Sequence, residues 1–247
     1  NRNKKSLAID LKSNHGRSLT LEICKSANVI IENNRPGVMQ RLGLGEEEVK
    51  KINNKIVYTS VSGFGQTGEL KNRAGINLII EALSGTLSVM GEKGEIPPRP
   101  GLQTADILGA MFATYSTLAG LIGQIQHNQG MHADVALIEA SIASAVWETT
   151  EYLSSGIVPE QLGHSHRASA PYQLFETNDK RYIAIGAPSD AHFKRLMNIL
   201  GLNDLYENPK FTSYSSRKEN ENDLVPVVAD KIMAVSYTHL TLPTTTI

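Results

Sequence analysis

The chain has 247 residues, of which 40% are hydrophobic and 20% are charged. This composition excludes a disordered or fibrous chain and predicts one sizeable core, or one domain and part of another. Lys and Arg number 24 against 25 Asp and Glu, so the formal net charge is −1. A charge this close to zero predicts neither nucleic acid nor an anionic membrane as a partner, and any anion must be bound by a local cluster.

Two further features narrow the class of protein. Cys24 is the single cysteine, which excludes an internal disulfide framework and a cysteine-rich metal site and fits a reducing, cytoplasmic setting. No apolar stretch is expected to approach the roughly 20 residues of a membrane helix. The chain opens on Asn1 without an initiator Met or a signal peptide, so it is interpreted as starting inside a longer protein.

In chain order, strand and helix patterns alternate. Strands are predicted at 6–10, 29–32, 55–60 and 131–135, and helices at 16–27, 36–41, 46–53, 104–126 and 137–153. The segment 76–83 and the helix at 104–126 are expected to be buried. This alternation predicts an α/β fold with a Rossmann-like parallel sheet and ligands at the carboxyl ends of its strands.

Two domains are predicted, both of them incomplete. A polar, histidine-containing link at 156–171 separates a large domain, 1–158, from the start of a smaller α+β domain, 159–235. The smaller domain is expected to contain a hairpin around Asn178-Asp179 and a helix at 190–200. Residues 236–247 hold five Thr and no charge, and we interpret them as a non-native tail.

Asp106 is the most informative carboxylate. It falls in the first turn of the apolar helix, directly after a Pro/Gly-rich loop at 91–101. Free backbone N–H groups and the helix dipole favour the ionised carboxylate there, which a nucleophile requires. An Asp at this position is also an ordinary helix-stabilising residue, and position alone favours that second interpretation.

A second cluster joins the end of a strand to the start of a short helix. Two guanidinium groups and two amides at a helix N-terminus suit phosphate, although a solvated surface turn fits as well. The members are Asn33, Asn34, Arg35, Pro36, Gly37 and Arg41, which Lys12 could join. The glycine-rich loop 62–68 contains the spacing G-x-G-x-x-G, but no apolar helix follows, so it is weak evidence for a dinucleotide.

Other catalytic centres find little support. His164 and His166 lack a third ligand nearby in the sequence, so no metal site is predicted. Cys24 lies on an apolar helix face and no Gly-x-Ser-x-Gly elbow is present, so neither a cysteine nucleophile nor a serine hydrolase is indicated.

Several blocks together resemble the class III coenzyme A transferases of the CaiB/BaiF type, a family that also includes formyl-CoA transferase, carnitine CoA-transferase and 2-methylacyl-CoA racemase. The resemblance covers residues 1–224. The matching blocks are N-R-N-K-K-S-L at 1–7 leading to D-L-K at 10–12, E-N-N-R-P-G-V-M-Q-R-L-G at 32–43, S-G-F-G-Q-T-G at 62–68, residues 130–134, and Pro171-Tyr172 with Phe175.

The resemblance implies an enzyme that moves coenzyme A from an acyl-CoA to a free carboxylic acid through a covalent aspartyl intermediate, without a metal. Asp106 matches the family's nucleophile, which reverses the preference for a capping role. The residues that correspond to coenzyme A contacts are Ile9, Lys12, Asn33, Arg41 and Leu42, of which Ile9 and Leu42 line the adenine side. The implied assembly is an interlocked homodimer, and a chain that lacks both ends of the family fold is expected to be inactive alone.

Alternatives stay open within and outside the family. In the racemases a His follows the Ala-Gly pair after the glycine loop, whereas Ile76 follows Ala74-Gly75 here and cannot transfer a proton, so a transferase is favoured. The remaining alternatives are a racemase or epimerase, a non-catalytic CoA-binding module and a dinucleotide-dependent oxidoreductase. The acids are not identified, and the candidates for selecting them are Gln103, His166 and Tyr172.

Overall fold

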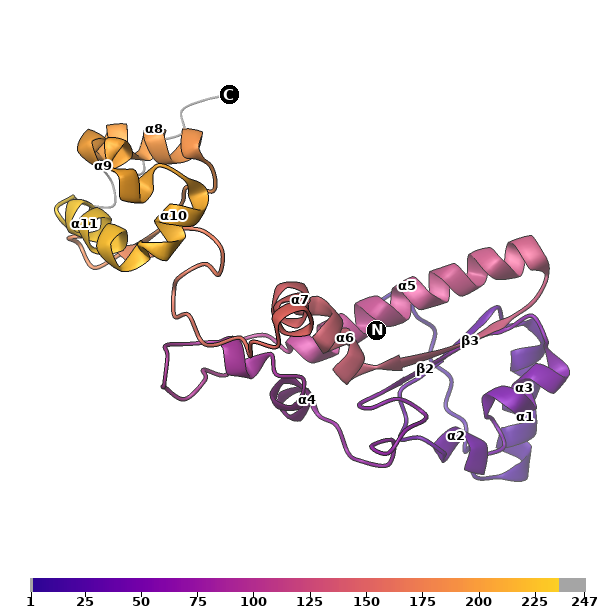
Figure 1. Ribbon diagram of the computed structural model, residues 1–247. Helices are drawn as coiled ribbons and strands as arrows, with labels where there is room; N and C mark the ends of the chain where they lie inside the picture. Colours follow the sequence, from indigo (N-terminus) through magenta and orange to yellow (C-terminus); the bar gives the residue numbers. More distant parts are fainter. Residues whose placement is uncertain (1, 236–247) are drawn as a thin grey trace. The chain divides into compact units, whose positions relative to one another are not determined.

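The computed structural model of the protein describes residues 2–235, so the predicted tail lies outside the described residues. The chain forms two compact units (Figure 1). The first consists of Asn1–Val89 and Pro97–Pro159, and the second of Met90–Ile96 and Glu160–Ile247. Sequence patterns did not indicate that residues 90–96 join the second unit.

This segment joins the second unit through hydrogen bonds to the chain that follows Pro159. The Gln161 side-chain amide donates to the carbonyl oxygens of Met90 and Glu95, at 2.7 Å and 3.1 Å. The Gly94 N–H donates to the Gln161 side-chain oxygen at 3.2 Å. Residues 90–96 therefore belong to the second unit because the Gln161 side chain hydrogen-bonds to their backbone.

The first unit alternates strands and helices, which confirms the predicted α/β class. Its elements are α1 (Asn14–Ser26), β1 (Val29–Glu32), α2 (Val38–Arg41), α3 (Glu46–Ile52), β2 (Val57–Ser62), α4 (Asn77–Leu83), η1 (Leu87–Val89), α5 (Thr104–His127), β3 (Met131–Ala136), α6 (Leu137–Ser144) and α7 (Val146–Ser155).

The strands of this unit form a parallel sheet in the order β1-β2-β3. The register aligns Val29 with Val57 and Val57 with Met131. Since all three strands run in one direction, their carboxyl ends meet at one edge of the sheet. In α/β proteins this edge is where ligands bind.

Helices cover both faces of the sheet. Successive side chains of a strand point to opposite faces. In β2, Tyr58 packs with Cys24 of α1 and Val49 of α3. The next residue, Thr59, shares a 2.8 Å hydrogen bond with Thr117 of α5. The sheet therefore lies between α1 with α3 on one face and α5 on the other.

Residues 6–10 do not form the strand predicted for them. Asp10 instead closes a turn into α1, because its carboxylate accepts from the Lys12 N–H at 3.0 Å and its carbonyl accepts from the Ser13 hydroxyl at 2.9 Å. Leu7 is exposed and no strand among residues 2–235 pairs with this segment. Without a neighbouring strand an apolar segment cannot form a ladder.

The helix predicted at 137–153 is divided into α6 and α7 by Ala145, whose φ and ψ are −83° and 52°. Hydroxyl groups near the break bond to carbonyls of α6. The Ser144 hydroxyl donates to the Ser141 carbonyl at 2.7 Å, and Thr149 donates to the Ile142 carbonyl at 3.3 Å. Such side-chain bonds compete with helical bonds and bend helices.

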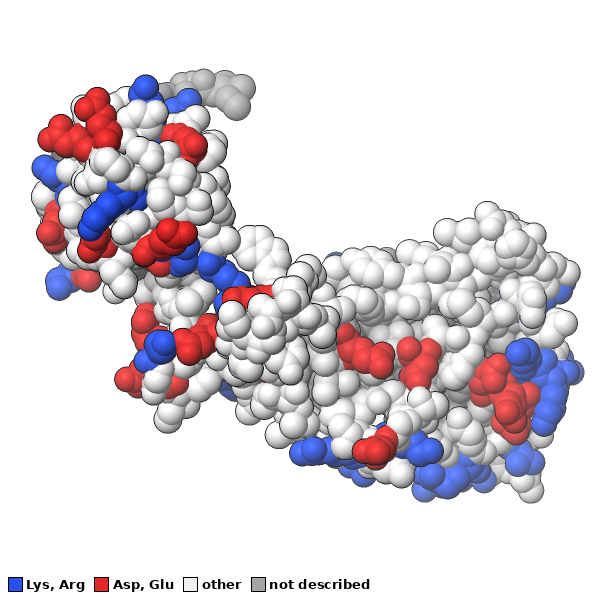
Figure 2. Space-filling model, viewed as in Figure 1, with Lys and Arg blue, Asp and Glu red and all other residues white. Residues whose placement is uncertain are grey.

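The expectation that the helix at 104–126 is buried is wrong for one of its faces. The residues that α5 buries are small, namely Ala105, Gly109, Ala113, Thr117 and Gly120. The large apolar residues lie outward and exposed, namely Ile107, Met111, Phe112, Tyr115, Leu118, Ile122 and Ile125. We call this second set the outer face of α5. In Figure 2 the surface over α5 is almost uncharged, whereas Lys and Arg gather over α1, α2 and α3.

Geometry explains this exposure. With 24 residues α5 is about 36 Å long. The longest strands of the sheet have 6 residues and span about 20 Å. Small residues allow the helix to approach closely, so the sheet contacts a narrow stripe only. α4 was also expected to be buried, which is correct for Ile80 but wrong for Leu78, Ile79 and Leu83, which are exposed.

α5 also corrects the expectation that no apolar stretch approaches the length of a membrane helix. By length and composition alone it is long and apolar enough to cross a membrane, and it is one such helix among the described residues. Scattered Thr, Ser and Gln residues hide this property when only uninterrupted apolar runs are sought. Because a helix of a folded α/β unit can pass the same test, the finding does not by itself indicate a membrane.

The second unit is an α+β unit with an antiparallel hairpin and helices. Its elements are β4 (Tyr172–Glu176), β5 (Tyr182–Gly186), α8 (Asp190–Leu200), α9 (Asn203–Glu207), η2 (Pro209–Phe211), α10 (Tyr214–Glu219) and α11 (Glu221–Met233). Its core contains Phe175, Phe193, Met197, Phe211, Leu224, Val228 and Ile232. The fully buried Arg217 pairs with Asp190 at 2.8 Å.

Candidate active site

A pocket of about 390 Å³ lies at the carboxyl ends of the three parallel strands. Each strand contributes residues at or just beyond its end: Asn33 follows β1, Ser62 and Gly63 close β2, and Leu137 follows β3. The volume falls within the range of small-molecule sites. The pocket therefore occupies the edge of the sheet at which an α/β protein binds ligands.

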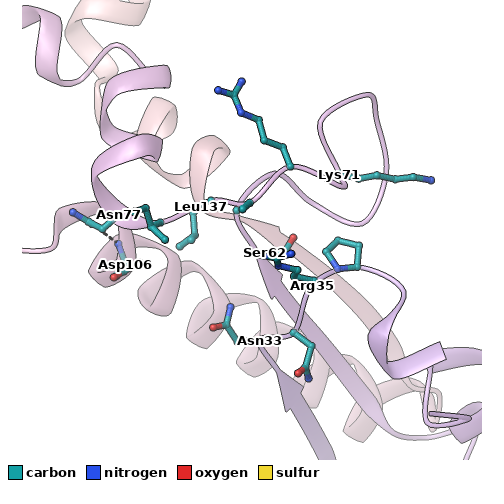
Figure 3. A pocket seen from close by; sticks show the side chains of 14 residues that line it. Asn33, Arg35, Ser62, Lys71, Asn77, Asp106 and Leu137 are labelled. Atoms are coloured by element: carbon teal, nitrogen blue, oxygen red, sulfur yellow. Dashed lines mark hydrogen bonds between the residues drawn. The ribbon is translucent and has the colours of Figure 1, made fainter. Parts of the chain in front are cut away.

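The rest of the wall comes from the loop after β1, the loop before α4, and the first turns of α4 and α5. These segments contribute Asn34, Arg35, Pro36, Lys71, Arg73, Ala74, Gly75, Ile76, Asn77 and Asp106. Figure 3 shows Asp106 beside Asn77 at one end of the pocket and Lys71 at the other. Arg35, Lys71 and Arg73 give the wall three cations against one lining carboxylate, so the pocket suits an anionic ligand.

Asp106 lies in the first turn of α5 and is exposed. Its backbone N–H donates to Asn77 Oδ1 at 3.2 Å, the bond drawn dashed in Figure 3. Its carboxylate accepts no hydrogen bond from residues 2–235. The positive end of the helix dipole favours the charged carboxylate. The arrangement provides an unpaired carboxylate at the pocket, which can act as a nucleophile or a base.

Two glycine segments meet in the wall of the pocket. A Cβ at Gly75 would lie 2.9 Å from the Gly63 Cα, closer than real Cβ contacts, so both positions require glycine. The glycine loop that follows β2 is fixed from β3, because the Gln66 N–H donates to Asp134 Oδ2 at 2.8 Å. Gly65 has a φ of 86° in this loop, a left-handed conformation that favours glycine.

The structure brings two of the residues implied by the family resemblance to this pocket, Asn33 and Asp106. The Asn33 amide donates to the Val61 carbonyl at 2.8 Å and so ties the end of β1 to β2. The remaining four are not lining residues of the pocket. Ile9 and Leu42 are half-buried, and Lys12 and Arg41 are exposed.

Sequence patterns did not single out Lys71, Arg73 or Asn77 as site residues. Lys71 and Arg73 lie in the loop between the glycine loop 62–68 and Ala74-Gly75. The cations in this loop were the one feature of the sequence that could have indicated an anion site here. Asn77 is the first residue of α4, and nothing in the sequence around it indicated a role in the site. Its role depends on a contact 29 positions along the chain, which no local pattern reveals.

Other candidates from the sequence are not among the residues that line this pocket. His166 and Tyr172 stack in the second unit with ring centroids 4.5 Å apart, and Gln103 is not a lining residue of the pocket. His164 lies 3.9 Å from Glu92. Among residues 2–235 no group of three or more His, Cys, Asp or Glu side chains is arranged to hold a metal ion.

The fold and the pocket define an α/β protein with a cationic pocket at the carboxyl edge of a parallel sheet, next to an unpaired aspartate. The family model of CoA-transferase family III matches residues 1–240. The chain belongs to this family.

Several known proteins are similar to this chain. An acyl-CoA transferase of Fusarium pseudograminearum is 35% identical over 235 residues, which are 94% of this chain and 51% of that protein. Mouse succinyl-CoA:glutarate CoA-transferase is 33% identical over 229 residues, 93% of this chain and 52% of that protein. Human alpha-methylacyl-CoA racemase is 31% identical over 236 residues, 94% of this chain and 61% of that protein.

A solved structure supports the same assignment. A CaiB/BaiF family protein from Brucella suis matches with a TM-score of 0.80 and 30% identity, over 97% of this chain and 63% of that chain. The chain therefore spans about half the length of the first curated relatives it matches and less than two thirds of this structure.

Proposed function

We propose that the full-length protein transfers coenzyme A from an acyl-CoA thioester to a free carboxylic acid, with Asp106 as the nucleophile. The observation that carries the proposal is the position of Asp106. Its unpaired carboxylate lines a cationic pocket at the carboxyl edge of the sheet, in a chain of CoA-transferase family III.

The reaction begins when the Asp106 carboxylate attacks the thioester carbonyl. The C–S bond breaks, the CoA thiolate leaves, and a mixed anhydride forms. The thiolate then attacks the Asp106 carbonyl, which releases the first acid and leaves an aspartyl-CoA thioester. The acceptor carboxylate attacks this thioester, which releases the CoA thiolate and forms a second mixed anhydride between Asp106 and the acceptor. The thiolate then attacks the acceptor's carbonyl carbon, which forms the new acyl-CoA and frees the Asp106 carboxylate. Each step exchanges one acyl bond for another, so neither ATP nor a metal enters the balance.

The surroundings of Asp106 supply the other requirements. Arg35, Lys71 and Arg73 line the pocket and suit the phosphates of coenzyme A or the carboxylates of the acids. We include Ile9, Lys12, Asn33, Arg41 and Leu42 as further coenzyme A contacts in the full-length protein. Backbone N–H groups of the glycine loop 62–68 are suited to stabilise the oxyanions.

Ile76 favours transfer over racemisation. It lines the pocket at the position that a proton-transferring His occupies in the racemases, and an aliphatic side chain has no proton to exchange. The names of the relatives point to dicarboxylic acids, since the mouse protein is named for succinyl-CoA and glutarate. We therefore expect a dicarboxylyl-CoA donor and a dicarboxylate acceptor.

The assembly we propose is an interlocked homodimer of the full-length protein in the cytoplasm. The outer face of α5 supports the dimer, because an apolar face of seven large side chains requires a protein cover. Light scattering of the full-length protein without detergent is expected to give a monodisperse dimer. A stable monomer, or a protein soluble only in detergent, would argue against it.

Asp106→Asn tests the function directly. We expect wild-type protein to transfer CoA from succinyl-CoA to a panel of dicarboxylic acids and the variant to lose transfer by several orders of magnitude with its melting temperature preserved. Incubation with succinyl-CoA and hydroxylamine should modify the peptide that contains Asp106, and mass spectrometry detects this modification. Exchange of the α-hydrogen of a 2-methylacyl-CoA without transfer would instead support the racemase alternative. Coenzyme A binding without turnover would support a non-catalytic module, and NAD binding the oxidoreductase.

A further inference from the structure

The first turn of α5 has no cap of its own. The first N–H groups of a helix lack partners within the helix and usually receive a side-chain acceptor from the N-cap residue. Gln103 occupies that position with φ and ψ of −84° and 74°, and its side chain makes no capping hydrogen bond. The donors at the start of the helix that carries Asp106 must therefore be satisfied from elsewhere.

Two side chains of α4 provide the missing acceptors. Glu81 Oε1 accepts from the Thr104 N–H at 3.1 Å and also from the Thr104 hydroxyl. Asn77 Oδ1 accepts from the Asp106 N–H. Residues four apart lie on one face of a helix, so Asn77 and Glu81 together hold the first turn of α5 against α4.

Glu81 is a buried acidic residue, which is uncommon for a residue that only joins two helices. Its side chain is 1% exposed, and within residues 2–235 it has no ion-pair partner. Its second oxygen, Oε2, has no hydrogen-bond partner among the described residues. Burying an unpaired carboxylate is costly, and the positive end of α5 is the compensation that this arrangement offers. Its contacts therefore fix where α5 begins.

This arrangement leaves the Asp106 carboxylate free. Asp106 is the third residue of α5, and an acidic side chain at this position often folds back to accept the N–H of the N-cap residue. Such a bond would occupy the nucleophile and turn it from the pocket. α4 supplies acceptors for the Thr104 and Asp106 N–H groups, and the Asp106 carboxylate itself accepts no hydrogen bond from the described residues.

We infer that Glu81 is a positioning residue for Asp106: it caps α5 from outside so that the carboxylate of Asp106 remains unpaired and directed at the pocket. This inference rests on the proposed transfer of CoA through Asp106. Reacting groups must be held within fractions of an ångström, and a displacement of about 1 Å can cost about 100-fold in rate. Removal of the Glu81 acceptor therefore acts on the rate of acyl transfer more than on substrate binding.

The test compares Glu81→Leu and Glu81→Gln in the full-length protein, with Glu47→Gln on α3 as a control on a remote exposed glutamate. Leucine fills a similar space without an acceptor, whereas glutamine retains the Oε1 acceptor. We expect Glu81→Leu to lower kcat by about tenfold or more with KM for succinyl-CoA within twofold, and Glu81→Gln to restore most of kcat. Thr104→Val, which removes only the hydroxyl donor, should give a smaller loss and serves if Glu81→Leu does not fold.

Wild-type kcat in Glu81→Leu or in Thr104→Val, or an equal loss in Glu81→Leu and Glu81→Gln, would overturn the inference. A crystal structure of the Leu variant adds a readout independent of activity: the Asp106 carboxylate should lie within hydrogen-bond distance of the Gln103 or Thr104 N–H. An unchanged Asp106 side chain would also overturn it. If wild-type protein shows neither turnover nor a hydroxylamine adduct at Asp106, the proposed function has failed instead, and the structural readout still decides the capping role.

Discussion

The Asp106 N–H donates to Asn77 Oδ1 at 3.2 Å, so the backbone of one pocket residue is held by the side chain of another. Asn77→Ala removes this acceptor. We expect the free energy of unfolding to fall by about 1 kcal/mol, the usual cost of losing a cap, and kcat to fall with it. Denaturant unfolding and steady-state kinetics measure the two effects. Asn77→Asp retains the acceptor and should preserve stability, and a normal kcat in Asn77→Ala would contradict the prediction.

Gly75→Ala should damage the pocket through the backbone. The added methyl carbon would lie 2.9 Å from the Gly63 Cα, and backbone atoms cannot move aside as a side chain can. We expect a loss of about 1–3 kcal/mol in unfolding free energy, as for overpacked sites, together with a raised KM for acyl-CoA. Gly101→Ala is the matched control, because a Cβ there meets no atom within 4 Å. Equal stability and KM in the two variants would disprove the argument.

Charge reversal at Lys71 tests whether the pocket cations attract the substrate. Lys71→Glu puts an anion in the wall of the pocket. KM for acyl-CoA should rise several-fold at low ionic strength, and the difference from wild type should shrink near 1 M salt, where the Debye length is about 3 Å. Lys231→Glu in α11 is the control. A salt-independent effect, or the same effect from Lys231→Glu, would mean that Lys71 does not act through charge.

His166 makes the stability of the protein dependent on pH. Burial, aided by the positive charge of Lys218, lowers the pKa of His166 below its ordinary value. Its Nδ1 accepts the Ala168 N–H at 3.1 Å, a bond that only an unprotonated Nδ1 can accept. Since the folded pKa lies below the unfolded value of about 6.5, the unfolded state binds the proton more readily. The contribution of His166 is therefore complete above that value and is lost as the pH falls through the interval down to the folded pKa.

The measurement is the melting temperature of the full-length protein between pH 8 and pH 5, compared with that of His166→Gln. The stabilising advantage of the wild type should decline as the pH falls. An advantage that is constant, or that grows in acid, would show that the sign is wrong.

Local patterns predicted the elements that local forces determine. The helix at 190–200 coincides with α8, which Ser189 caps by accepting from the His192 N–H at 3.3 Å. The parallel sheet followed from the alternation of elements. The segment 6–10 had a strand pattern but no partner, and a partner is a property of the whole fold.

The candidate site divides in the same way. Asp106 was found from its place at the start of a helix and from the family resemblance. Its neighbours Asn77 and Glu81 were missed because their roles depend on how α4 packs against α5. The burial of α5 was overestimated because apolar composition indicates that a face must be covered but not which part of the molecule covers it.

The small residues of α5 that pack on the sheet determine how the whole helix is placed, including its first turn. A Cβ at Gly120 would lie 2.7 Å from Val57 Cγ1, and Gly120 is 14 positions, or about 21 Å, from Asp106 along the helix axis. A methyl group added at Gly120 is therefore expected to shift α5 against the sheet, and with it the first turn that carries Asp106. Under the proposed function, a position far from the pocket would then affect the rate of transfer.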